Sequence, residues 1–155
     1  MNGTKVLVIG YGNPGRGDDG LGPALATRLE MLAIPGVTVE ADYQLSIEHA
    51  ALAAEHDVVV FADAATDAEG PFYLRPITAA AGDACSSHSV TPGQVLFLAR
   101  RCFSATPRSF VLGIRATSLD RFEEGLSSGA EEGLASALEH LIAFLGENPR
   151  GNGEI

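Results

Sequence analysis

The sequence predicts an α/β fold, a three-layer sandwich in which a twisted, mostly parallel five-stranded sheet carries helices on both faces. Apolar runs at residues 5–10 and 58–62 continue without polar alternation, as is typical of strands buried on both faces. Segments with helical spacing of leucines lie between the expected strands, and alternating strands and helices favour a parallel sheet. The chain has 155 residues, which suits one domain with its own core.

The first half of the chain is expected to alternate strand and helix twice. Strands are predicted at residues 5–10, 37–42 and 58–62, the last of them ending on Asp63. Leu21, Leu25, Leu29 and Leu32 recur at helical spacing, with Pro23 tolerated in the first turn of that helix. A short helix is predicted at residues 46–54.

The second half is expected to add two strands and two helices. The strands are predicted at residues 72–77 and 109–114, and a loop of small residues at 79–89 carries His88. Thr91, Pro92 and Gln94 form a capping-box pattern with proline at the first helical position, which predicts a helix through about residue 101. Leu134, Leu138, Leu141 and Leu145 mark the last amphipathic helix. We therefore expect a single domain over residues 1–146 and a flexible C-terminal tail at 147–155.

Composition excludes several classes of function. The formal net charge is −10, which argues against a nucleic-acid surface because phosphate binding depends on Lys and Arg. No apolar run reaches the roughly 18 to 20 residues of a membrane span, and the first ten residues form a strand rather than a secretory signal. The two cysteines, Cys85 and Cys102, form no CxxC pair, so reduced thiols are expected. We expect a monomeric, cytoplasmic protein.

The stretch VLVIGYGNPGRGDDG at residues 6–20 resembles a dinucleotide-binding turn only in part. Gly10, Gly12 and Gly15 spell the G-x-G-x-x-G fingerprint after a strand, and such a turn holds a pyrophosphate at the start of the next helix. Here the adjacent carboxylates Asp18 and Asp19 occupy that place. They would repel an anion but suit a cation or water, so the turn predicts a different ligand.

Acidic residues follow three of the predicted strands. Asp18 and Asp19 follow the first strand, Asp42 ends the second, and Asp63 ends the third. The carboxyl ends of parallel strands form the usual ligand-binding rim of an α/β fold. We therefore expect these carboxylates to converge there, with His88 reaching the same edge from its loop.

Some of these residues also have structural interpretations. Asp18 is interpreted mainly as the N-cap of the first helix, and Asp42 as a residue that caps or turns the following loop. A doubled acid together with Asp63 exceeds what capping requires, so Asp19 and Asp63 are the candidate functional residues. His49, His56 and His140 lie in or beside helices and are interpreted as structural, and Cys85 is interpreted as a small loop residue.

Asp19, Asp63 and His88 together form an oxygen and nitrogen ligand set that suits a divalent transition metal such as nickel or zinc. A nucleophilic hydrolase is less well supported. The sequence contains no G-x-S-x-G elbow, and it lacks the paired D-T-G or D-S-G motifs of pepsin-like proteases.

The ordered motifs resemble those of the hydrogenase maturation endopeptidases. VLVIGYGNPGRGDDGLG is similar to their opening pattern, DYQLSIEHAALAAEHDVVVFADA to their second acidic position and D-A strand end, SSHSVTPGQVLFLA to their S-x-H loop and helix, and LGIRATSLDRFEEGLS to their G-I…S-L…G-L-S stretch. The resemblance runs from about residue 5 to residue 145.

The resemblance implies an enzyme that removes a C-terminal extension from the large subunit of a nickel–iron hydrogenase after nickel insertion. The family's metal-contacting residues fall on Asp19, Asp63 and His88, which would serve as both catalytic and nickel-recognising groups. The nickel would be carried by the precursor rather than held permanently by the protease. The expected partner is therefore the nickel-loaded large-subunit precursor.

Two alternatives remain at the level of sequence. Peptidyl-tRNA hydrolases also begin with a strand and G-x-G-N-P-G, but their turn continues toward a histidine–asparagine pair and a tRNA-binding protein should be basic. A non-enzymatic nucleotide-binding module is supported by the glycines and by Asp42 at the end of the second strand. That reading leaves Asp19 and His88 unexplained.

Overall fold

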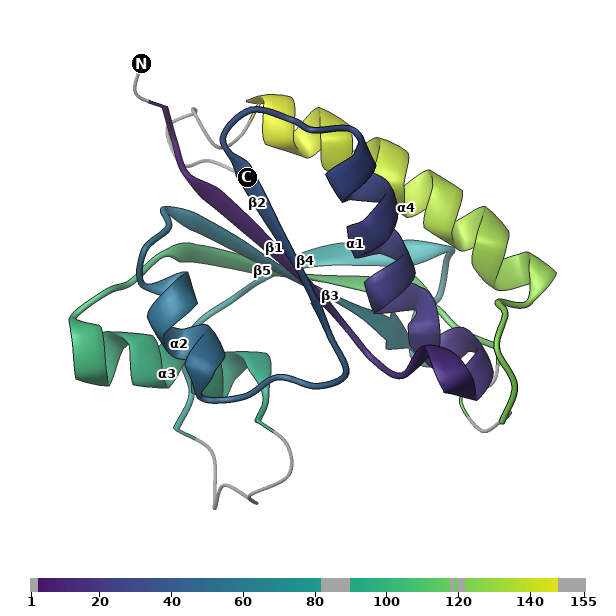
Figure 1. Ribbon diagram of the computed structural model, residues 1–155, viewed down its shortest axis with the longest axis horizontal. Helices are drawn as coiled ribbons and strands as arrows, with labels where there is room; N and C mark the ends of the chain where they lie inside the picture. The colour runs from purple at the N-terminus through teal and green to yellow at the C-terminus, as the bar shows by residue number, and fades with distance from the viewer. Residues whose placement is uncertain (1–2, 82–89, 118, 120–121, 148–155) are drawn as a thin grey trace.

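The computed structural model describes residues 3–81, 90–117, 119 and 122–147, and it confirms the predicted α/β fold. Five strands form one sheet in the order β2-β1-β3-β5-β4 (Figure 1). β1, β2, β3 and β5 are parallel, and β4 runs antiparallel to β5 at one edge. The strands are β1 (Val6–Tyr11), β2 (Val37–Asp42), β3 (Val58–Ala65), β4 (Phe72–Ile77) and β5 (Arg108–Arg115).

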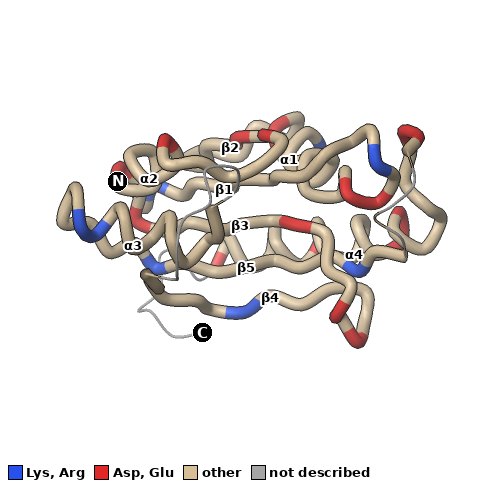
Figure 2. Tube along the Cα trace, turned by 90° about the horizontal axis from the view of Figure 1, so that it is seen from below, with Lys and Arg blue, Asp and Glu red and all other residues tan. Residues whose placement is uncertain are grey.

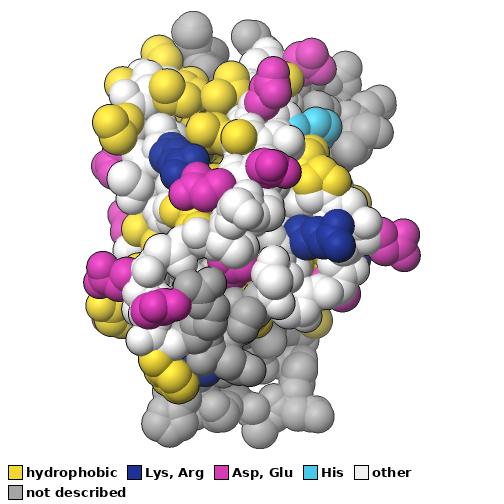
Figure 3. Space-filling view, turned by 90° about the vertical axis from the view of Figure 1, so that its right-hand side faces the viewer, with side chains coloured by type: hydrophobic (Ala, Val, Ile, Leu, Met, Phe, Trp, Pro, Cys, Tyr) yellow, Lys and Arg dark blue, Asp and Glu magenta, His cyan; other side chains and the backbone are white. Residues whose placement is uncertain are grey.

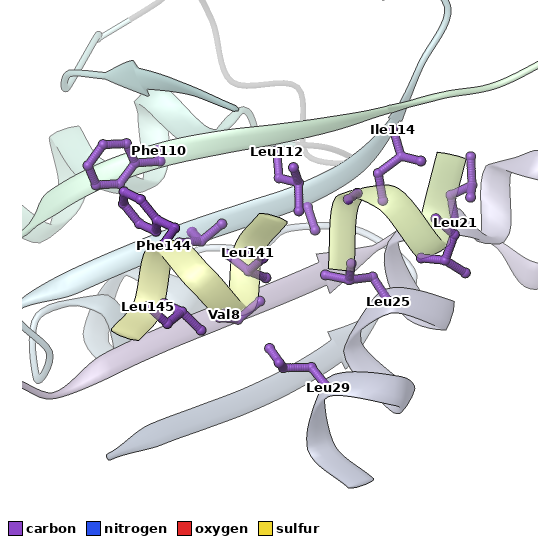
Figure 4. Close-up of a cluster of buried hydrophobic side chains, with 14 of the residues drawn as sticks. Val8, Leu21, Leu25, Leu29, Phe110, Leu112, Ile114, Leu141, Phe144 and Leu145 are labelled. Atoms are coloured by element: carbon purple, nitrogen blue, oxygen red, sulfur yellow. The ribbon is translucent and has the colours of Figure 1, made fainter. Parts of the chain in front are cut away.

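Two helices cover each face of the sheet, as the sequence predicts. α1 (Leu21–Met31) and α4 (Ser128–Glu147) lie on one face, and α2 (Glu48–Ala53) and α3 (Pro92–Phe103) lie on the other (Figure 1). Leu21, Leu25 and Leu29 of α1 pack with Leu141 and Phe144 of α4 over the strands (Figure 4). Burial of a large apolar side chain of this kind contributes roughly 1.5 to 3 kcal/mol.

The second core lies under α2 and α3. Alternate residues of the same strands, including Leu7, Ile9 and Phe61, pack there against Leu45, Val95 and Leu96. β1 and β3 therefore bury both faces, which explains their unbroken apolar runs.

The structure refines several predicted boundaries. α3 begins at the predicted capping box, in which Thr91 Oγ1 accepts a hydrogen bond from the Gln94 N–H and Gln94 Oε1 accepts one from the Thr91 N–H. α2 is shorter than predicted, whereas β3 continues to Ala65. The prediction that β3 ends on Asp63 is wrong, because β5 pairs with β3 as far as Ala65 while β1 pairs with it only to Ala62.

β3 therefore extends beyond β1 on one side of its carboxyl end, and Asp63 lies in that extension. No helix in the described part of the chain combines the length and the apolar character needed to cross a membrane.

Candidate active site

The turn after β1 brings α1 directly against the strands. A Cβ atom on Gly22 would meet backbone atoms of Tyr11 and Ala62, and one on Gly10 would meet the carbonyl of Gly22. Glycine at these positions allows the helix and the sheet to touch through their backbones. Packing thus explains Gly10 of the G-x-G-x-x-G pattern without a bound pyrophosphate.

A 3-10 segment, η1 (Pro14–Gly20), separates β1 from α1 and carries the doubled acid. Asn13 caps this segment, since its Oδ1 accepts a hydrogen bond from the Gly15 N–H at 2.9 Å. Asp18 and Asp19 emerge from its last turn with different surroundings. The two neighbouring carboxylates therefore have different roles.

Asp18 does not cap α1, so that prediction is wrong. The N-cap of α1 is Gly20, which makes no side-chain capping bond. The Asp18 carboxylate is instead buried, with 1% of the residue exposed. It accepts hydrogen bonds from the backbone N–H of Thr117, the backbone N–H of Ser127 and the Ser127 hydroxyl, each at 2.8 Å. Asp18 thus connects the opening turn to the segment that leads from β5 into α4.

Asp19 is half-buried at the rim of the sheet. One oxygen, Oδ2, accepts a hydrogen bond from the Asn13 N–H at 2.9 Å. The other oxygen has no partner among the residues that the structure describes. This oxygen is thus available to a ligand.

Asp63 lies within β3 on the sheet face that α2 and α3 cover, because it continues the alternation of Val59 and Phe61. Burial raises the pKa of its carboxyl group to about 6, and the negative charge of Asp19 acts in the same direction. Hydrogen bonds from the Ala64 N–H, at 2.7 Å, and from the Tyr11 hydroxyl oppose this rise. The Asp19 and Asp63 carboxylates therefore lie close enough to interact electrostatically, as expected for a shared site.

In Figure 2 acidic positions lie on β3 and gather beyond it at the right-hand end of the molecule, opposite the N-terminus. Asp63 stands next to the end of β1, beyond the last residue of β3 that pairs with β1. A carboxyl group with a pKa near neutrality can ligate a metal when ionised and can also exchange a proton.

Tyr11 is a site residue that the sequence reasoning missed. It ends β1. Burial is the main cause that raises the pKa of its hydroxyl group, and the nearby negative charge of Asp63 raises it further. The hydroxyl therefore stays protonated and donates a hydrogen bond to Asp63. The signal available in the sequence was the alternation of Leu7, Ile9 and Tyr11, which places a polar tip at the end of an otherwise apolar face.

Tyr73 of β4 is a second missed residue. β5 places Gly113 between Asp63 and Tyr73, because Gly113 pairs with both residues. The Tyr73 ring lies over Gly113 in the space that a side chain there would fill. The Arg75 guanidinium group stacks on the same ring at 3.7 Å from its centroid. These contacts make an aromatic wall beside Asp63.

Asp42 lies at the end of β2, as predicted, and its contact is to His49. Asp42 Oδ2 is 3.3 Å from His49 Nε2, and the Ser46 N–H donates to His49 Nδ1 at 2.9 Å. Because His49 is buried and Asp42 is half-exposed, this pair fixes the loop between β2 and α2. The contacts of His56 with the Leu52 carbonyl and of His140 with Phe72 are also structural.

His88 and Cys85 lie outside the described residues, so the proposed third ligand stays a prediction. Within residues 3–81, 90–117, 119 and 122–147, no group of three His, Cys, Asp or Glu side chains is arranged to hold a metal ion. The described part of the site therefore consists of Asp19 and Asp63, supported by Tyr11 and bordered by Tyr73.

Comparison with known proteins places this fold among the maturation proteases. No protein-family model matches the chain, and no curated protein matches it significantly. Among solved structures, a [NiFe] hydrogenase maturation protease HycI from Thermococcus kodakarensis KOD1 is 25% identical, with a TM-score of 0.73 over 95% of this chain and 96% of that protein.

Two further structures share the fold. The hydrogenase maturating endopeptidase HybD from Escherichia coli is 22% identical, with a TM-score of 0.71 over 92% of this chain and 93% of that protein. A hydrogenase 2 maturation peptidase from Thaumarchaeota archaeon SCGC_AB-539-E09 is 22% identical, with a TM-score of 0.68 over 92% of this chain and 98% of that protein.

These likenesses extend over nearly the whole of each chain and agree with the ordered motifs from residue 5 to residue 145. The chain therefore shares its fold with solved hydrogenase maturation proteases over nearly its whole length.

Proposed function

We propose that this protein is an endopeptidase that removes the C-terminal extension from the large-subunit precursor of a nickel–iron hydrogenase after nickel has been inserted. The names of the similar structures support processing of a hydrogenase precursor. The observation that carries the site assignment is the electrostatic coupling between the half-buried Asp19 and Asp63 at the rim of the sheet. We further propose that processing takes place in the cytoplasm.

In this proposal Asp19, Asp63 and His88 recognise nickel that the substrate carries. Two carboxylates with an imidazole suit a divalent transition metal. When the protease meets a metal-free precursor, its Asp19 and Asp63 carboxylates would face each other without a cation and would repel each other. Nickel loading thereby becomes a condition for productive binding, because only the loaded precursor neutralises the acidic pair.

The proposed cleavage step uses groups next to the scissile peptide bond. Asp63 has a pKa of about 6, so near neutral pH its carboxylate can accept a proton from water as that water attacks the carbonyl carbon. The protonated Asp63 then gives this proton to the leaving amide nitrogen as the C–N bond breaks, which releases the new carboxylate and the amine. The positive charge of the nickel that the substrate carries would polarise the same carbonyl. The Tyr11 hydroxyl donates to Asp63 and orients its carboxylate.

The test is incubation of the protein with nickel-loaded and nickel-free precursor, followed by electrophoresis and mass spectrometry of the products. The proposal predicts one cut in the loaded precursor and none in the nickel-free form. Asp63→Asn, Asp19→Asn and His88→Ala should each abolish this cut and remain folded by circular dichroism. Equal cleavage of both precursor forms would show that nickel is not recognised.

A further inference from the structure

The edge of the sheet at β2 is open in the described part of the chain. β2 is the first strand of the sheet order and pairs only with β1. The carbonyl of Asp42 accepts a hydrogen bond from the Gly12 N–H, as that of Gly36 does from the Val6 N–H. Because residues of a parallel strand alternate in the neighbour they face, Val39 and Ala41 direct their backbone groups away from β1.

A groove with both apolar and polar lining runs along the same edge. It has a volume of about 290 Å³ and lies between β2 and the end of α1, with Leu29, Ile34, Val37 and Val39 among its lining residues. Every second side chain of a strand added beside β2 would point toward this groove.

Exposed apolar side chains lie next to the groove in the sequence and beyond the end of β2. Met31 and Leu32, at the end of α1, are 79% and 50% exposed, and Tyr43 and Ile47 are also exposed. Figure 3 shows hydrophobic side chains gathered at the upper left, on the side of the molecule where α1 and β2 lie. Exposed apolar surface of this kind favours a binding partner.

The negative charge of this edge favours a basic peptide over a second copy of the chain. Residues 29–42 contain Glu30, Glu40 and Asp42 but no Lys or Arg. Pairing with a second copy of the chain would bring acid against acid across the two edges, which is unfavourable. A peptide that carries basic and apolar residues in alternation would satisfy both the charge and the groove.

The edge is also continuous with the candidate active site. β2 ends at Asp42, which pairs in register with Tyr11, and Tyr11 donates to Asp63. Strands of a sheet are about 4.8 Å apart, so a peptide leaving the β2 edge needs about three extended residues to reach β3. An occupant of the edge can thus enter the site without leaving the surface.

We propose that the β2 edge binds the substrate peptide next to the scissile bond as an added strand, and that it selects an extended segment with alternating apolar and basic residues. This inference rests on the proposed endopeptidase function. The backbone of Val39 and Ala41 binds the peptide main chain, the groove takes its apolar side chains, and Glu40, on the opposite face of β2 from Val39, faces its basic ones.

A direct test uses an end-capped heptapeptide of alternating lysine and valine, titrated into the ¹⁵N-labelled protein. We expect the amide signals of Val39 and Ala41 to shift and to gain protection from hydrogen exchange. A peptide of alternating glutamate and valine is the control and should leave them unchanged. Absence of these shifts with the lysine peptide, or equal shifts with both peptides, would overturn the proposal.

Ala41→Pro tests the same surface during processing. Proline removes the outward N–H but leaves the pairing of β2 with β1 intact, because the Ala41 N–H does not face β1. We expect KM for the loaded precursor to rise about tenfold with kcat unchanged, since one or two main-chain hydrogen bonds are lost. Ala41→Val keeps the N–H and should keep the parental KM.

Glu40→Lys reverses the charge on the face of β2 that the basic side chains of the peptide would meet. We expect it to weaken binding of the lysine peptide by up to about fivefold, the range of a surface charge pair. An unchanged KM in Ala41→Pro and unchanged peptide binding in Glu40→Lys would each contradict the proposal. A wild-type dimer that Ala41→Pro dissociates in sedimentation would assign the edge to a second copy instead.

These outcomes separate the docking surface from the proposed function. If the lysine peptide binds at β2 but no precursor is cut, the endopeptidase proposal fails. If the precursor is cut and neither the peptide nor the variants show an effect, the docking surface fails.

Discussion

Asp63 combines ionisation with burial, and this combination affects both function and stability. Its carboxyl group has a pKa of about 6 in the fold because burial penalises the charged form, compared with about 4 in an unfolded chain. Between these values the native state binds more protons than the unfolded state. The free energy of unfolding contributed by this group therefore falls as pH rises from about 4 to about 6.

Asp63→Asn should remove this pH dependence. Relative to the parent, the stability of the variant should rise across that pH window by up to about 3 kcal/mol, at about 1.4 kcal/mol for each unit of pKa shift. Thermal melts at pH 4, 5, 6 and 7 measure the difference. Glu69→Gln changes an exposed acid in the same way and should follow the parent at every pH. A difference that does not change with pH would contradict the buried, ionised state of Asp63.

Asp18 and Asp19 are chemically identical neighbours with different contacts. Asp18→Ala removes three hydrogen bonds to a buried carboxylate and leaves the backbone N–H groups of Thr117 and Ser127 without that acceptor. It should lower stability by about 3 kcal/mol or more.

Asp19→Ala is the matched comparison. It loses one hydrogen bond, from Asn13, which is worth about 1 kcal/mol, and it relieves repulsion with Asp63. Its stability should therefore stay near that of the parent, while processing is lost. Urea unfolding and the precursor assay measure the two effects, and equal destabilisation by the two substitutions would contradict the different roles.

At the scale of elements, the contact of α1 with β1 and β3 through glycine positions the doubled acid beside Asp63. Gly22→Ala would push a methyl group into the backbone of Tyr11 and Ala62, and overpacking of this kind typically costs 1 to 3 kcal/mol, about 3 in a rigid contact. We expect the variant to lose stability and processing together, because η1 must move with the helix.

Gly146→Ala is the control for this substitution. Gly146 lies in α4, and a Cβ atom added there would have no other atom within 4 Å. Alanine at this position should therefore raise stability by about 0.5 to 1 kcal/mol through helix propensity. Thermal melts of both variants check the pair. Similar melting temperatures for Gly22→Ala and the parent would show that α1 does not contact the strands as described.

At the scale of the whole molecule, local patterns in the sequence predicted the fold class and most elements. Unbroken apolar runs identify β1 and β3 because both faces of these strands are buried, and the capping box identifies the start of α3 because its two hydrogen bonds are local. The position of Asp63 at the rim of the sheet could also be predicted from the sequence, since Asp63 comes directly after an apolar run.

Long-range contacts could not be predicted in the same way. Asp18 binds residues about 100 positions away, so a local pattern could only suggest a helix cap. Tyr11 and Tyr73 reach Asp63 through strand order and register, which follow from the packing of the whole sheet. The extension of β3 beyond β1 likewise depends on the length of β5, a strand more than 40 residues further along the chain.

The central claim is that Asp63 and its neighbours at the rim recognise nickel in the precursor. The most direct measurement is the Kd of nickel-loaded and nickel-free precursor, determined by stopped-flow before cleavage begins, for the parent, Asp63→Asn and Glu69→Gln. The account predicts that nickel lowers Kd at least about tenfold for the parent and Glu69→Gln, equivalent to about 1.4 kcal/mol, and has no effect for Asp63→Asn. An equal preference for the loaded precursor in Asp63→Asn would contradict it.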